Sequence, residues 1–113
     1  MIGRYKVITL IGSTRFKEYF EKVATNLTLN GYIVLPLTAF SNYNQIQLSD
    51  STTEMLKDMI RKKIDISDEV YVVNPDGYID EDTMNEIEYT LDLNKKVTFM
   101  SSKVDVGIFK YYK

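Results

Sequence analysis

Four apolar, β-branched stretches alternate with amphipathic segments along this chain, and this alternation restricts the fold more than any other feature. The apolar stretches are residues 6–11 (KVITLI), 32–37 (YIVLPL), 69–74 (EVYVVN) and 97–100 (VTFM). Between them apolar residues recur at helical spacing, for example within residues 16–27. Buried strands separated by helices predict a parallel sheet with right-handed crossovers and helices on both faces. We therefore expect one α/β domain, residues 1–113, with four to five strands, the fifth within residues 104–112.

The composition excludes several classes of function. The net charge is −2 and the chain has no basic patch, so we do not expect a nucleic-acid polymer as partner. Cysteine and histidine are both absent, which removes disulfides, thiolate nucleophiles and the commonest zinc ligands. We expect neither a metal nor a cofactor. Without a signal peptide or a membrane-length apolar run, the chain is predicted to be cytoplasmic and to make no membrane contact.

Ligands of parallel α/β sheets bind beyond the carboxyl ends of the strands, which directs attention to residues 12–15, 38–51 and 74–83. A strand that stops at Gly12 and Ser13 and opens a helix points backbone N–H groups at one spot. Such a turn suits an anion or a polar ligand, and Arg15 lies on it. The alternative is that Ser13 or Thr14 only caps the helix.

The segment that follows the third strand is rich in carboxylates. Asp80 and Asp82 fall in the first turn of a predicted helix, where they complement its dipole, and the spacing lacks the pattern of a calcium loop. Glu86 and Glu88 lie about 200° apart around that helix, so they cannot face the same ligand. In a chain without histidine or cysteine, Glu86 is the strongest candidate nucleophile. The alternative is that it is a solvated helix residue.

Three stretches together carry a resemblance to a known family: residues 8–16 (ITLIGSTRF), 62–79 (KKIDISDEVYVVNPDGYI) and 86–97 (EIEYTLDLNKKV). In this order, over nearly the whole chain, they resemble the nucleoside 2-deoxyribosyltransferase-like superfamily. The short bacterial and phage members, similar to 2'-deoxynucleoside 5'-phosphate N-hydrolases, are the most alike. The resemblance implies a flavodoxin-like, usually dimeric protein. It also implies cleavage of the N-glycosidic bond of a nucleoside or its 5'-monophosphate, with water or a second base accepting the sugar.

The resemblance also implies roles for individual residues. Glu86 stands four residues before Thr90 and nine before Lys95, as does the family's nucleophile, which attacks C1' of the sugar. The first-loop motif, which binds the 5' end of the nucleotide or its neighbourhood, corresponds to Gly12, Ser13 and Arg15. The remaining residues expected to line the pocket are Asn74, Gly77 and Tyr78.

Two departures from the family pattern affect these expectations. Ile60 stands where the family has an acid that assists the leaving base, and Asp65 is the carboxylate that could replace it. Asp80 and Asp82 stand where phosphate-binding relatives have small or hydroxyl residues, and carboxylates there would repel a phosphate. The alternative function is a nucleoside- or nucleotide-binding or interaction module that has lost catalysis.

Two further α/β functions fit the sequence less well. A receiver domain would need paired acids after the first strand, and a dinucleotide-binding enzyme would need a three-glycine fingerprint. We also expect a homodimer, for which the aromatic tail with Phe109, Tyr111 and Tyr112 is a candidate interface. The alternative is that this tail is an edge strand that covers its own core.

Overall fold

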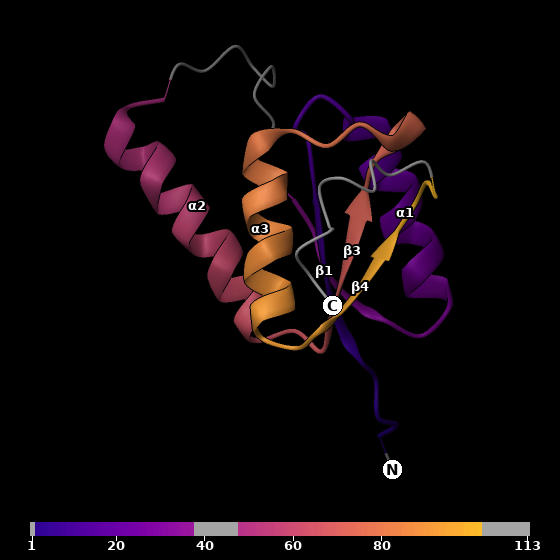
Figure 1. The fold of residues 1–113 in the computed structure, drawn as a ribbon. Coiled ribbons are helices and arrows are strands. Elements are labelled where there is room, and N and C mark those ends of the chain that lie inside the picture. Colours follow the sequence, from indigo (N-terminus) through magenta and orange to yellow (C-terminus); the bar gives the residue numbers. More distant parts are fainter. Residues whose placement is uncertain (1, 38–47, 103–113) are drawn as a thin grey trace.

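The computed structural model describes residues 2–37 and 48–102. Strands and helices alternate as the sequence predicts, with a short 3-10 turn inserted after the third strand (Figure 1). The elements in chain order are β1 (Val7–Gly12), α1 (Lys17–Leu29), β2 (Ile33–Leu35), α2 (Asp50–Asp65), β3 (Glu69–Val73), η1 (Pro75–Gly77), α3 (Glu81–Asp92) and β4 (Lys96–Phe99).

The four strands form one parallel sheet in the order β2-β1-β3-β4. Gly12 at the end of β1 is paired with Val73 at the end of β3, so these two strands finish side by side. The predicted α/β class with a parallel sheet is therefore confirmed, and the strand order is consistent with a flavodoxin-like fold. The candidate fifth strand and the aromatic tail, residues 104–112, lie outside the described residues.

Apolar side chains of the strands point alternately to the two faces of the sheet and build two cores. On one face Ile11, Val70 and Val72 pack with Ile64 of α2 and Ile87 of α3. On the other face Leu10 and Val73 pack against Phe20 of α1. Helices thus cover both faces, as predicted, with α1 opposite α2 and α3 (Figure 1).

Local chemistry accounts for most of the helix ends. α1 ends at Leu29 with Asn30 as its C-cap, and the next residue, Gly31, takes the left-handed conformation, with φ +91°, that favours glycine. Ser49 caps the start of α2 by accepting a 3.2 Å hydrogen bond from the backbone N–H of Thr52.

Lys95 caps a neighbouring helix. Lys95 follows α3, and its ammonium group donates to the carbonyl oxygens of Ile64, Asp65 and Ser67 at the end of α2, at 2.8, 2.7 and 2.8 Å. A cation at a helix C-terminus is favourable because the last carbonyl groups lack partners within their own helix. The loop between α3 and β4 therefore fixes the end of α2.

Candidate functional site

The turns that follow β1 and β3 lie at the same edge of the sheet, where α3 also begins (Figure 1). Gly12 has φ +153°, and a Cβ atom there would lie 2.5 Å from the carbonyl oxygen of Val73 and 3.0 Å from Cζ of Phe20. Only glycine permits this close approach between the β1 turn and β3. The structure thus gives Gly12 a packing role at the predicted site.

Arg15 and Tyr78, which the sequence places in different loops, meet at this edge. The Cζ atom of Arg15 lies 4.3 Å from the centre of the Tyr78 ring, a cation–π contact. Phe16 packs edge-on against the same ring, with 5.7 Å between the ring centroids. Ser13 is buried beside them, and its hydroxyl accepts a long, 3.4 Å hydrogen bond from the backbone N–H of Arg15. These contacts join the β1 turn to the β3 turn.

Phe16 occupies the N-cap position of α1, and its side chain makes no capping hydrogen bond. Ser13 and Thr14 lie before this position, in the turn that leads into α1. The start of a helix suits an anion or another hydrogen-bond acceptor.

Asn74 and Gly77 shape the turn after β3. Asn74 is fully buried, and its amide donates to the carbonyl of Ser101 at 3.2 Å and accepts from the N–H of Ser101 at 2.9 Å. These bonds tie the end of β3 to the chain beyond β4. Gly77 has φ +84° and donates its N–H to the carbonyl of Asn74 at 2.8 Å. Both residues lie at the predicted edge, and the contacts observed for them are with backbone groups of the protein itself.

Glu86 lies in the second turn of α3 with its side chain on the inner side of the helix. The residue is 8% exposed, and the next residue, Ile87, is part of the core. No hydrogen bond or ion pair joins its carboxyl group to any residue of ranges 2–37 and 48–102. Glu88, on the other side of α3, is partly exposed. The predicted separation of the two glutamates is therefore observed, and Glu86 is the buried one.

Burial is the main cause of an unusual pKa at Glu86. The pKa rises from the ordinary value of 4.5 to about 8, first because the carboxyl is removed from water and then because Asp80 and Asp82 add negative charge. Arg61 and Lys57 of α2 lower it in part. The Glu86 carboxyl is therefore mostly protonated near pH 7.

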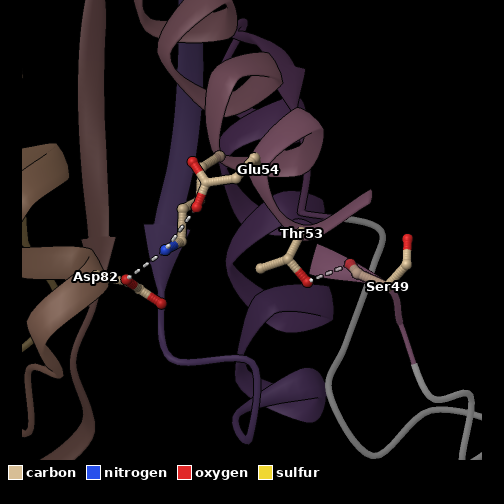
Figure 2. A network of polar contacts seen from close by, with 5 residues as sticks. Ser49, Thr53, Glu54 and Asp82 are labelled. Carbon is tan, nitrogen blue, oxygen red and sulfur yellow. Dashed lines mark hydrogen bonds and ion pairs between the residues drawn. The ribbon is translucent and has the colours of Figure 1, made fainter. Parts of the chain in front are cut away.

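The charged groups around Glu86 are themselves held in place. Asp80 is the N-cap of α3 and accepts a 2.8 Å hydrogen bond from the N–H of Thr83. The ammonium group of Lys57 lies 3.8 Å from Asp82 and 3.7 Å from Glu54, so it bridges α3 and α2 (Figure 2). Figure 2 also shows the start of α2, where the Thr53 hydroxyl donates to the Ser49 carbonyl. Lys57 therefore lies between the carboxylates of Glu54 and Asp82, near the N-terminus of α3.

Asp65 does not join Glu86. It is exposed at the far end of α2, where its carboxylate accepts a hydrogen bond from the Tyr89 hydroxyl. This end of α2 precedes β3 and so lies at the amino edge of the sheet, opposite the turns that hold Arg15. Ile60, in the position of the family's assisting acid, packs against the core. Asp65 is therefore left out of the candidate site.

The sequence did not single out Lys57 and Arg61. Their four-residue spacing places them on one side of a helix, which is the available signal. The sequence does not specify that this side turns toward α3, because that depends on how both helices pack on the sheet.

Other sites in the described part of the chain are less suited to chemistry. An open hollow of about 490 Å³ lies on α1, across the sheet from Glu86, and is lined by Glu21, Lys22, Thr25, Asn26 and Leu29. Within residues 2–37 and 48–102, acidic side chains form no group of three placed to hold a metal ion. None of the helices described combines the length and apolar character that crossing a membrane requires.

Comparison with known proteins adds no family assignment. No protein-family model matches the chain, and no curated protein matches it. The α/β fold and the carboxyl edge with Glu86, Arg15 and Tyr78 are therefore the basis for inferring function.

Proposed function

We propose that this protein cleaves or transfers the N-glycosidic bond of a nucleoside or its 5'-monophosphate, with Glu86 as the nucleophile. The observation that carries the proposal is that Glu86, a residue only 8% exposed in the second turn of the helix that begins at the carboxyl edge of the sheet, accepts no hydrogen bond at its carboxyl group from the described chain. Such a group is available to a ligand, and strongly perturbed carboxyls of this kind are concentrated in active sites. The Arg15–Tyr78 pair, on the turns at the same edge of the sheet from which α3 begins, offers a cation and an aromatic face for substrate binding.

The reaction follows from the chemistry of an ionised carboxylate. A carboxylate oxygen of Glu86 attacks C1' of the sugar while the bond from C1' to the base nitrogen breaks, and the base leaves with the electron pair. The departing nitrogen takes its proton from water. Water, or the nitrogen of a second base, then attacks C1' and releases Glu86 as a carboxylate. Lys57 and Arg61 favour the ionised form that this step requires.

The cellular setting is part of the same proposal. We place the protein in the cytoplasm as a homodimer that acts on a small molecule. The absence of cysteine and of a basic patch supports this setting over one that depends on disulfides or on nucleic-acid polymers.

A second candidate function is nucleoside or nucleotide binding without catalysis. It is favoured by the packing of Ile60 in the core, where an acid would assist the leaving base, and by the protonated state of Glu86 near neutral pH. A protonated carboxyl is a poor nucleophile. The two functions differ in whether base is released at high pH, where Glu86 is ionised.

Base release from a panel of deoxynucleosides, ribonucleosides and their 5'-monophosphates tests both functions. Near pH 8.5 the wild type should release base, and Glu86→Gln should lower the rate at least about 100-fold, because an amide cannot form the glycosyl ester. Glu88→Gln, the same change on the other side of α3, should leave the rate within about twofold. Undiminished turnover by Glu86→Gln would eliminate the nucleophile assignment. Tight binding without base release by the wild type would establish the second function instead.

A further inference from the structure

Carboxylates gather at the start of α3, at the carboxyl edge of the sheet. Asp80 is the N-cap of this helix, and Glu81 and Asp82 lie in its first turn. Lys57 pairs with Asp82, but it shares its charge with Glu54 of its own helix. Acidic residues at a helix start also complement the helix dipole, so their charge does not by itself identify a ligand. It does favour a cationic ligand over an anionic one at this edge.

The carboxyl of Glu86 is a second observation, and it points to a ligand of the same charge. Glu86 is 8% exposed and accepts no hydrogen bond from residues 2–37 and 48–102. Asp80 and Asp82 act on it electrostatically and help to raise its pKa. A positive charge brought within about 4–6 Å favours the ionised form of a carboxyl. A cationic ligand would therefore offset the charge of these acids and also favour the ionised form in which Glu86 acts as a nucleophile.

The acids of this edge have other roles than donating a proton to a leaving base. Asp80 accepts a backbone hydrogen bond at 2.8 Å, and Asp82 pairs with Lys57, so both serve as charged acceptors. Glu86 holds a proton near pH 7, but it has to lose that proton before it can attack a sugar carbon. A base that departs as a neutral molecule needs no proton, because the electron pair of the broken bond neutralises its positive charge.

Aromatic rings at the same edge suit a flat cation. Tyr78 holds the guanidinium group of Arg15 over its ring, with the Cζ atom 4.3 Å from the ring centre. Phe16 packs edge-on against both Tyr78 and Tyr19, with centroid distances of 5.7 and 5.9 Å. Tyr78 and Tyr19 are 40% and 46% exposed, so ring surface is left for a ligand. The face of an aromatic ring attracts a cation, which favours a cationic base over a neutral base of the same shape.

We propose that the substrate is a nucleoside whose base carries a positive charge, as in a pyridinium nucleoside or an N-alkylated purine nucleoside. The inference rests on the proposed cleavage by Glu86 and names its substrate class. A carboxylate oxygen of Glu86 bonds to C1' while the bond from C1' to the ring nitrogen breaks, and the electron pair of that bond neutralises the ring. Water then attacks C1', the ester bond to Glu86 breaks, and the proton released by the water goes to solvent.

Rates of base release test the substrate class. Nicotinamide riboside is compared with cytidine, and N7-methylguanosine with guanosine, each also as the 2'-deoxy compound. The assay is run below neutral pH, where the methylated base keeps its charge, and uncatalysed release is subtracted. General acid catalysis contributes about 10²–10⁴-fold where it operates. Because a neutral base lacks this help here, kcat/KM should be at least about 100-fold higher for the cationic member of a pair.

The outcomes separate this inference from the proposed function. A preference of less than about tenfold for the cationic base, in every pair that is cleaved, would overturn the inference and keep the glycosidic activity. Cleavage of neutral nucleosides alone would do the same. No release from any of these substrates would overturn both.

Binding to the Glu86→Gln variant, which should not cleave, tests the part played by the acids. Calorimetry compares nicotinamide riboside with its neutral dihydro form, which has nearly the same shape. Adding Asp80→Asn removes a charge and keeps a side chain that can cap α3, so it should weaken binding of the cation at least about threefold and leave the neutral form unchanged. Asp92→Asn, the same change at the exposed far end of α3, is the matched control and should alter neither affinity. Equal effects of Asp80→Asn on both ligands, or none on the cation, would overturn recognition of the positive charge by these acids.

Discussion

Replacing Glu86 with glutamine should stabilise the folded protein, and the gain should grow as the pH rises. In the folded chain the pKa of this carboxyl is about 8, against an ordinary value of 4.5, chiefly because of burial. Each pKa unit corresponds to about 1.4 kcal/mol. Ionising Glu86 in the folded protein therefore costs about 5 kcal/mol more than in the unfolded chain, from the difference between 4.5 and about 8.

Proton linkage gives the sign and the pH range. Below pH 4.5 the carboxyl is protonated in both states, and the full contribution to stability is present. As the pH rises toward about 8, the unfolded chain loses this proton while the folded chain keeps it, so the free energy of unfolding falls. Glutamine has the same shape and does not titrate. The difference in unfolding free energy between Glu86→Gln and wild type should widen by about 3 kcal/mol between about pH 5.5 and about pH 9.

Urea denaturation followed by far-ultraviolet circular dichroism measures this difference at each pH. Glu88→Gln is the matched control, because the same chemical change is made on the partly exposed side of α3. Its stability should run parallel to that of the wild type. If Glu86→Gln also runs parallel, the carboxyl of Glu86 is not desolvated in the folded protein. A difference in unfolding free energy that widens with pH, together with loss of base release in Glu86→Gln, would show that Glu86 lowers stability and is required for activity.

Three other outcomes follow from the same contacts. Base release should rise about tenfold between about pH 6 and about pH 7 and level off above about pH 9, as Glu86 ionises with a pKa of about 8, and a flat pH profile would contradict this. Asp82→Asn should move the midpoint of that profile to lower pH, because it removes a charge that raises the pKa of Glu86 and frees Lys57; an unchanged midpoint would exclude this coupling. Lys95→Met should lower the free energy of unfolding by roughly 2 kcal/mol, measured by urea denaturation, because three carbonyl groups at the end of α2 lose their donor; an unchanged midpoint would show that water replaces it.

The fold was predictable because periodicity and turn chemistry are local signals. The first strand and first helix begin within about a residue of their predicted positions. β2 is shorter than the predicted strand, at Ile33–Leu35, because it is an edge strand and Pro36 has no N–H to donate. Element type and parallel order therefore follow from sequence, while the exact length of an edge strand depends on its single neighbour.

The site was predictable only in part. Helical geometry separates Glu86 from Glu88, and the sheet rule brings Arg15 and Tyr78 to one edge, where they make contact. The sequence-based prediction that Asp65 replaces the missing acid depends only on its being close in sequence to Ile60. Five residues along a helix, however, turn a side chain about 140° away, so Asp65 cannot point where a residue at position 60 points.

Local chemistry favours the fold at most of the helix ends and disfavours it at Glu86. Ser49 and Asp80 cap the helices that follow them, and Lys95 caps the end of α2. Asp80 also has the opposite effect, because its charge raises the pKa of the buried Glu86 carboxyl. A chain selected only for stability would have an amide or an apolar group at position 86. Departures from local consistency are expected at functional sites, so the cost of this carboxyl supports the role proposed for Glu86.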